Sequence, residues 1–280
     1  LTPLLLALAV WVYGPTVFTV ALSFLDWNLT TDPEGFVGLA NYTELFEHPE
    51  FTRAAWQTVL YALALLPFST VVPFVLAVLL WMRPSRASTV YRSLLFVPAI
   101  MAPVAVAVAW RFLLNPLQGL VAGALGMAGL AAVNWLGDPA TALAVVVAVT
   151  APKVTAFNML LCGAALASLD RRVVEAARIE GATSWEVIRF VVVPHVAPTL
   201  VALALLSVVL AGQWVFTNIS ELTAGGPDGA TDNVYFRIYT LGFDFFDTGE
   251  ASAAAVVVLL AFAVLAVAWQ LVRRSSDVRS

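Results

Sequence analysis

The sequence has little charge and little reactive chemistry for its length. Only 11% of its 280 residues are charged, whereas 61% are hydrophobic, and a soluble domain carries roughly 25% charged residues. Its only lysine, Lys153, follows a proline, so the chain has no P-loop to bind the phosphates of a nucleotide. The one cysteine, Cys162, excludes an internal disulfide, and the two histidines do not form an HExxH metal motif. These absences argue against an enzyme and against a metal site.

The sequence contains several long apolar runs with no charged residue or only one. Asp, Glu, Lys and Arg are absent from residues 1–25, 54–82, 190–220 and 251–272. Two further apolar runs, 93–114 and 141–166, carry one charge each, Arg111 and Lys153. About 20 apolar residues of helix cross a bilayer. We therefore expect an all-α integral membrane protein, with one transmembrane domain over residues 1–280 and six helices at about 3–25, 56–82, 93–114, 141–166, 195–219 and 251–272.

The basic residues predict the orientation of these helices. Lys and Arg accumulate in short cytoplasmic loops, and most arginines here lie in segments 83–92, 171–189 and 273–279. These segments share one side only if both termini are cytoplasmic, which also places the loop 167–194 inside. A crossing at the glycine-spaced segment 112–137 would separate them, so we expect short, closely packed helices there, on the outer surface. We also expect a cytoplasmic tail before residue 1, with a cleaved signal peptide as the alternative.

Polar residues inside the apolar segments are candidates for function, because such groups are costly in a bilayer. Lys153 and Asn158 lie in the fourth predicted helix, and Gln213, Thr217 and Asn218 lie in the fifth. Gln213 and Thr217 are four residues apart and share a helical face. Hydrogen bonding between helices and contact with a substrate both remain open for each of them. Lys153 could instead pair with an acid of a neighbouring subunit. No Asp or Glu lies inside a predicted helix, which disfavours an ion-coupled secondary transporter.

A charged segment, EAARIEGA at residues 175–182, stands between two apolar blocks. Helix formers precede Gly181, which suits the left-handed position that ends a helix. Thr183 and Glu186 have the spacing of a capping box that begins a second helix. The pattern predicts a helix–glycine–helix elbow whose small residues fit a groove of another protein, with Glu175 and Arg178 available to pair across the interface. An amphipathic connector lying on the membrane is the alternative.

The segment EAARIEGATSWEVIRFVVVPHVAP, residues 175–198, resembles the EAA loop of ABC importer permeases. Four other segments are similar to the carbohydrate, maltose-type branch of that family: FVGLANYTELF (36–46), YRSLLFVPAI (91–100), WLGDPATAL (135–143) and ELTAGGPDGATDNVYFRIYTLGF (221–243). One departure is Glu180, where the family commonly has Asp before the glycine. The resemblance implies a type I importer fold with a cytoplasmic coupling helix that contacts the ATPase through Glu175, Ala176, Ala177, Arg178, Gly181 and Ala182.

The resemblance also implies partners and a transport role. This chain would be one of two non-identical permease subunits in a bacterial cytoplasmic (inner) membrane, forming a heterodimer. Two copies of a separate ATPase subunit would bind ATP and Mg, and an extracytoplasmic solute-binding protein would deliver a sugar or related polyol. Glycerol 3-phosphate and amino sugars are alternative substrates. The chain itself would bind no cofactor, and its net charge of −4 argues against nucleic acid as a partner.

Two sets of residues are expected to serve transport. The candidates for the substrate path combine amides, a hydroxyl and an aromatic ring, as a sugar site requires: Gln213, Thr217, Asn218, Asn158 and Trp110. An outer turn near the binding protein is expected at Gly225, Gly226 and Pro227.

Overall fold

The chain is helical and divides into two compact units. A computed structural model describes residues 2–28 and 35–277, with side chains as far as residue 270. The first unit comprises Leu1–Gln57 and Asp232–Ser280, and the second comprises Thr58–Thr231. Helix α4 (Pro49–Ser69) belongs to the first unit in its opening turns and to the second unit beyond them.

The first unit combines the two ends of the chain. Its long helix α14 (Thr248–Asp277) packs against α2 (Gly14–Leu22) and α3 (Ala40–Glu47). Leu45, Phe51, Val234 and Leu241 are among its buried residues. The remaining elements are α1 (Thr2–Leu8), the π-helix η1 (Ala9–Tyr13), the antiparallel strands β1 (Leu25–Asp26) and β2 (Gly35–Phe36), α13 (Val234–Tyr239) and the π-helix η3 (Thr240–Asp244).

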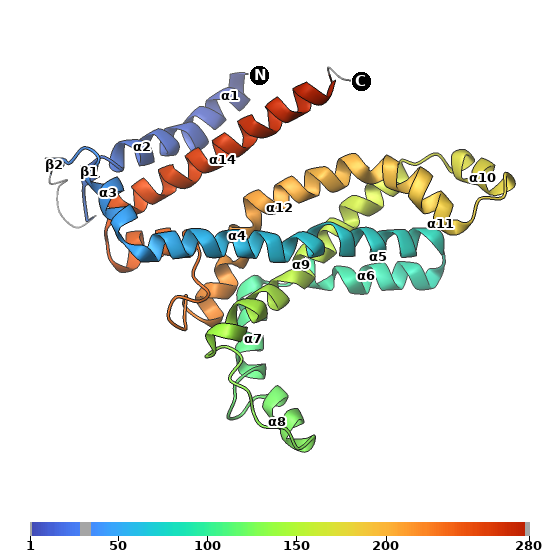
Figure 1. The fold of residues 1–280 in the computed structure, drawn as a ribbon, viewed down its shortest axis with the longest axis horizontal. Helices are drawn as coiled ribbons and strands as arrows, with labels where there is room; N and C mark the ends of the chain where they lie inside the picture. Colours follow the sequence, from blue (N-terminus) through green and yellow to red (C-terminus); the bar gives the residue numbers. More distant parts are fainter. Residues whose placement is uncertain (1, 29–34, 278–280) are drawn as a thin grey trace. The chain divides into compact units, whose positions relative to one another are not determined.

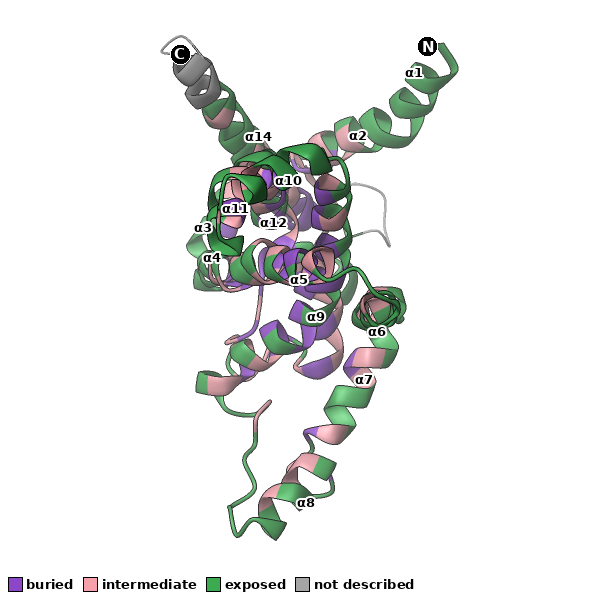
Figure 2. Ribbon diagram, turned by 90° about the vertical axis from the view of Figure 1, so that its right-hand side faces the viewer, coloured by how far each residue is buried: buried purple, intermediate pink, exposed green. Residues whose placement is uncertain are grey.

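The second unit is built around α9 (Pro139–Ala167), which packs against α5 (Val71–Met82), α6 (Arg86–Ile100) and α12 (Val193–Leu222) (Figure 1). Figure 2 shows buried residues along α9, whereas α6 is largely exposed. The other elements are α7 (Pro103–Leu113), α8 (Leu120–Met127), α10 (Arg171–Ile179), α11 (Ser184–Val187) and the π-helix η2 (Ile188–Val192). Helix α9 is therefore the central element against which α5, α6 and α12 pack.

Among the residues that the structure describes, five helices have the length and composition of membrane spans, and a bent pair of helices makes a sixth apolar segment if it is counted as one span. In the described part of the chain, five helices pass this test: Thr2–Leu22, Pro49–Met82, Pro139–Ala167, Ser184–Leu222 and Thr248–Gln270. The sixth segment, α6 with α7, is bent by 92°. The sequence predicted one continuous helix over 93–114, and the structure breaks it at Met101 and Ala102, whose backbones are extended. Pro103 explains the break, because proline disfavours helical geometry at the residue before it.

The glycine-spaced segment 112–137 contains one short helix, α8, in agreement with the expectation of short helices. The expectation of close packing at its glycines is wrong for Gly123, Gly126 and Gly129, because an added Cβ at each would meet no described atom within 4 Å outside its adjacent residues and the backbone of its own helix. Gly119 alone among these glycines is tightly enclosed. A Cβ there would lie 2.4 Å from the carbonyl oxygen of Leu113.

Candidate functional site

The elbow, α10 and α11 with the turn between them, has the local structure that its sequence predicts. Asp170 caps α10, its carboxylate accepting a hydrogen bond from the backbone N–H of Arg172 at 2.9 Å. The helix ends at Ile179, and Gly181 two residues later has a φ of +88°. Two backbone hydrogen bonds close the turn, from Gly181 to Arg178 and from Ala182 to Ala177. This is a Schellman motif, in which a left-handed glycine ends the helix.

The second helix of the elbow begins with the predicted capping box. The backbone N–H of Thr183 donates to Oε2 of Glu186 at 2.7 Å, and the backbone N–H of Glu186 donates to Oγ1 of Thr183 at 3.3 Å. These bonds satisfy donors that the first helical turn would otherwise leave without partners. The elbow therefore has two defined helices joined by a turn of fixed geometry.

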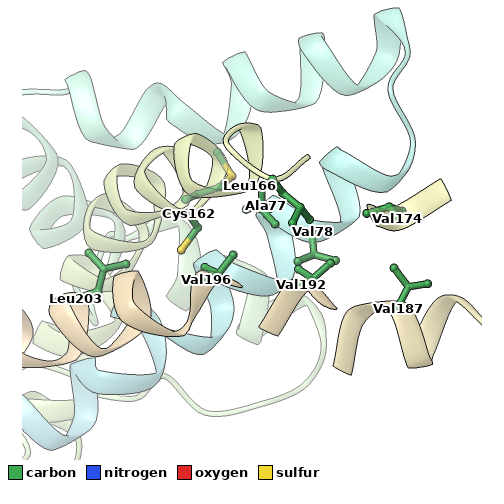
Figure 3. Close-up of a cluster of buried hydrophobic side chains, with 11 residues drawn as sticks. Ala77, Val78, Cys162, Leu166, Val174, Val187, Val192, Val196 and Leu203 are labelled. Carbon is green, nitrogen blue, oxygen red and sulfur yellow. The ribbon is translucent and has the colours of Figure 1, made fainter. Parts of the chain in front are cut away.

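One face of the elbow is anchored to the helix bundle. Val174 of α10 and Val187 of α11 are buried, in a cluster with Ala77, Leu166 and Val192 (Figure 3). Ala177 and Ala182 are partly buried and pack against the same cluster. These small and apolar contacts attach the elbow to α5, α9 and the start of α12, so a force on the elbow reaches the bundle through packed side chains.

The opposite face of the elbow is exposed and includes large apolar side chains. Glu175, Ala176, Arg178 and Gly181 are exposed. Ile179 is 87% exposed and Trp185 is 67% exposed. Exposed apolar residues rimmed by charges are typical of a protein interface. Of the six coupling residues predicted from the sequence, the structure thus exposes these four, while Ala177 and Ala182 pack partly against the bundle.

Asn218 and Thr150 form a buried link between α12 and α9. Nδ2 of Asn218 donates to Oγ1 of Thr150 at 2.7 Å, and that hydroxyl donates to the carbonyl oxygen of Val146 at 2.7 Å. Asn218 is 7% exposed. The contact joins residues 68 positions apart in the chain. Its geometry is that of hydrogen bonding between helices, one of the two roles that the sequence left open.

Asn158 lies at the junction between α4 and α5. Pro73 has no N–H, so it cannot donate to the carbonyl oxygen of Ser69 as a helix would require. Nδ2 of Asn158 supplies this donor at 2.8 Å, and Thr155 donates to the neighbouring carbonyl oxygen of Phe68 at 2.9 Å. Asn158 is 1% exposed, and its Oδ1 has no hydrogen-bond partner among the described residues. The structure therefore places Asn158 in a helix junction.

The other predicted pathway residues lie nearer the surface of the second unit. Gln213 is exposed and Thr217 is partly exposed on α12. Trp110 is 38% exposed on α7, which packs along α12. Lys153 is also exposed, near the middle of the apolar helix α9. An ionisable side chain at membrane depth is costly beside lipid and tends to face a cavity or a partner. Of the five residues predicted for the substrate path, Gln213, Thr217 and Trp110 are therefore accessible in this chain.

The turn at Gly225, Gly226 and Pro227, which the sequence predicts to lie on the outer side, is stabilised by Thr223 and Thr231. Gly225 has a φ of +80°, and Oγ1 of Thr231 donates to the carbonyl oxygen of Gly226 at 2.7 Å. The Thr231 hydroxyl also lies 2.7 Å from that of Thr223, and the Tyr61 hydroxyl donates to the Thr231 carbonyl at 2.9 Å. Sequence reasoning did not single out either threonine, although both lie in the segment LTAGGPDGAT. Their hydroxyl groups hold the backbone of the glycine turn in place.

A cavity of about 360 Å³ adjoins this turn. Gly226 and Pro227 line it together with Arg111, Asn115 and Asn134. Nη1 of Arg111 donates to the carbonyl oxygen of Glu221 at 3.3 Å, which joins α7 to the end of α12. Amide and guanidinium donors around a cavity of this size can bind a polar small molecule or a segment of another protein.

The FVGLANY segment has a structural role in the first unit. Nδ2 of Asn41 donates to the carbonyl oxygens of Ser23 and Leu25, each at 3.0 Å. The Tyr42 hydroxyl lies 2.7 Å from that of Ser23. The motif therefore fastens the end of α2 and the strand β1 to α3.

Comparison with known proteins identifies the family. Residues 36–274 match the family described as binding-protein-dependent transport system inner membrane component, and the chain belongs to this family. This confirms the resemblance seen in the sequence. The chain is a membrane-spanning permease subunit of an ABC importer, a transport component of the inner membrane rather than an enzyme.

Similar proteins include two permeases with assigned substrates. The sn-glycerol-3-phosphate transport system permease protein UgpA of Pectobacterium atrosepticum is 30% identical over 90% of this chain and 83% of its own length. The trehalose/maltose transport system permease protein MalF of Thermococcus litoralis is 30% identical over 94% of this chain and 87% of its own length.

A solved structure shares the fold. It is the crystal structure of a bacterial alginate ABC transporter in complex with an alginate pentasaccharide-bound periplasmic protein. The similarity has a TM-score of 0.84 at 23% identity, and it covers 98% of this chain and 92% of the other. The likeness confirms the predicted type I importer fold.

Proposed function

We propose that this permease translocates a sugar or related polyol and that its elbow transmits the ATPase cycle to the helix bundle. The observation that carries the proposal is the two-sided elbow, with Val174 and Val187 buried against the bundle and Ile179 exposed. One similar permease is named for trehalose and maltose transport, and a solved structure of the same fold is named for an alginate transporter. These names support a sugar as the substrate class.

The proposed complex has the partners that the family implies. A second homologous permease subunit would pair with this chain, and two copies of an ATPase subunit would bind ATP and Mg. The exposed face around Glu175, Arg178 and Ile179 would enter a groove on one ATPase, where charged groups set the register and the apolar side chain supplies the contact. Both termini and the elbow would be cytoplasmic, since Lys and Arg accumulate in cytoplasmic loops and most arginines of this chain lie in segments 83–92, 171–189 and 273–279.

The outer turn Gly225–Pro227 would receive the solute-binding protein. Its support is the cavity beside it, lined by Arg111, Asn115 and Asn134. Substrate would then pass Gln213, Thr217 and Trp110, which are accessible on α12 and α7. Asn158 and Asn218 would act on the same path by holding α9 against the α4–α5 junction and against α12. Transport requires the complex to alternate between an outward-open and an inward-open conformation. ATP and the loaded binding protein can drive this change only if each binds one of the two conformations more tightly than the other.

Glycerol 3-phosphate is a second candidate substrate. Arg111 beside the outer cavity and exposed Lys153 would suit its phosphate. The similar permease UgpA is named for sn-glycerol-3-phosphate transport.

Reconstituted importer, with both permeases, the ATPase and the binding protein, tests the coupling proposal. Ile179→Ser should abolish most of the substrate-stimulated ATPase activity, because it removes an apolar contact from the interface. Leu117→Ser is the matched control, since Leu117 is also 87% exposed but lies in the outer segment. Equal ATPase activity in the two variants would contradict the role of the elbow.

The substrate path has its own experiment. Gln213→Ala with Thr217→Val should raise the substrate concentration for half-maximal uptake, while complex assembly stays normal. Gln118→Ala is the control, because Gln118 is exposed outside the proposed path. Thermal-shift measurements on the binding protein with maltose, a polyol and glycerol 3-phosphate would identify the substrate class. Protection by glycerol 3-phosphate alone would replace the sugar proposal with the second candidate.

A further inference from the structure

A second cavity lies at the end of the helix bundle where α5 and α9 approach the elbow. Its volume is about 330 Å³, room for roughly ten water molecules at about 30 Å³ each. Apolar residues of α5 and α9 form most of its wall, and Trp81, Arg92 and Arg171 also line it. It is therefore an apolar crevice with two cationic residues.

The two arginines come from different elements. Arg92 belongs to α6 and Arg171 is the first residue of α10. Both are exposed, and neither forms an ion pair with another residue in the described part of the chain. Two guanidinium groups beside one cavity attract an anion, and their planar donors match the oxygens of a phosphate.

The surroundings of the cavity indicate a lipid. The cavity lies at the ends of two membrane-spanning helices, Pro49–Met82 and Pro139–Ala167. Trp81 is next to last in α5, and tryptophan is enriched where a membrane meets water. Basic pockets between transmembrane helices on the cytoplasmic side bind the head groups of anionic lipids.

We propose that this cavity binds the phosphate group of an anionic phospholipid, with Arg92 and Arg171 as its ligands and an acyl chain along the apolar wall. The assignment to the cytoplasmic leaflet rests on the orientation under Proposed function, whereas the binding chemistry does not. Ala77 and Leu166 line the cavity and also pack in the cluster that holds the elbow. A bound lipid would therefore stabilise the base of the elbow.

Native mass spectrometry of the complete importer measures lipid binding without transport, so failure of this proposal is distinct from failure of the proposed function. The probes are phosphatidylglycerol, phosphatidylcholine and inorganic phosphate. A guanidinium group in direct contact with the lipid phosphate should contribute roughly a five-fold change in affinity, more than the general attraction of a nearby basic residue to an anionic membrane. Arg92→Gln with Arg171→Gln should weaken phosphatidylglycerol binding about 25-fold. Arg83→Gln with Arg172→Gln is the charge-matched control and should change it less than about two-fold.

A steric variant tests the cavity itself. Gly163 lines it, and an added Cβ there would meet nothing within 4 Å. Gly163→Leu should fill this space and displace the lipid while every charge remains. Retained lipid in this variant, or equal weakening in the control pair, would overturn the site. If inorganic phosphate competed fully at millimolar concentration, the site would be one for soluble phosphate and the lipid proposal would be wrong.

Discussion

The junction between α4 and α5 depends on one side chain from α9. Pro73 leaves the carbonyl oxygen of Ser69 without its helical donor, and Nδ2 of Asn158 takes that place at 2.8 Å. Asn158→Leu should destabilise the permease, because it leaves this buried carbonyl without a partner. Pro73→Ala should restore stability in the same chain, because alanine supplies the N–H four residues after Ser69.

The size of the effect follows from the burial of both groups. A buried carbonyl left without its donor costs about 1–3 kcal/mol. Asn158→Leu also removes Oδ1, a buried acceptor without a partner among the described residues, which offsets part of this cost. The single variant should therefore lose about 1 kcal/mol. The coupling between the two substitutions should be about 1–2 kcal/mol, because the second repairs the defect that the first creates.

Denaturant titration of the four proteins in detergent micelles, the parent, both single variants and the double variant, measures this coupling. Val78→Ala, at another buried position of α5, is a control that should not be rescued by Pro73→Ala. Coupling below about 0.5 kcal/mol is the additivity expected of independent sites and would refute the proposed donor replacement. A change in substrate affinity without a change in stability would instead assign Asn158 to direct substrate contact.

Three further predictions concern the elbow, the outer turn and an acid beyond it. Gly181→Val should reduce the coupling of ATP hydrolysis to uptake, because a β-branched residue at a φ of +88° is strained by about 1–3 kcal/mol. Gly181→Asn should retain more coupling, because asparagine tolerates this backbone conformation better. Equal ratios of uptake to ATP hydrolysis in the two variants would contradict this reasoning. Thr231→Val should remove the hydroxyl bonds to Gly226 and Thr223 and lower the stability by about 1–3 kcal/mol, measurable as a lower Tm, whereas Thr43→Val, at an exposed helical hydroxyl, is the control. Burial raises the pKa of Asp232 to about 6, against the opposing effects of the Asn233 N–H and Arg237. The neutral carboxyl group of Asp232 is favoured in the folded state, so stability is lost as the pH rises from about 4 to about 6. Asp232→Asn should therefore stabilise the protein by about 1–2 kcal/mol at pH 7.5, after allowance for partial exposure, and should give no gain at pH 4. An equal gain at both pH values would exclude this titration.

The elbow shows how far local sequence can predict a site. Gly181 and the Thr183–Glu186 pair gave the turn and the second helix correctly, because a left-handed glycine and a capping box act over a few residues. The same sequence did not show which face would be buried against α5 and α9. Ala177 and Ala182 were grouped with the exposed coupling residues, and the structure packs both partly against the bundle.

Proline and glycine were harder to interpret within apolar segments. The run 93–114 has the composition of one crossing, but Pro103 breaks it with a 92° bend. The regular spacing of Gly119, Gly123, Gly126 and Gly129 suggested close packing, but of these four glycines the described residues enclose only Gly119. Spacing alone cannot distinguish a packed glycine from an exposed one, since both lack a side chain.

The sequence by itself determined that this protein is an all-α membrane protein with a helix–glycine–helix elbow, because hydropathy, capping and turn geometry are local properties; its role as a permease came from the resemblance of its motifs to a family. The tertiary structure decided what the intramembrane polar residues contact. Asn158 meets Ser69 from 89 positions away, and Asn218 meets Thr150 from 68 positions away. Bringing such groups together depends on how α5, α9 and α12 pack. A buried amide must find a partner wherever that packing provides one, so its role follows from the fold.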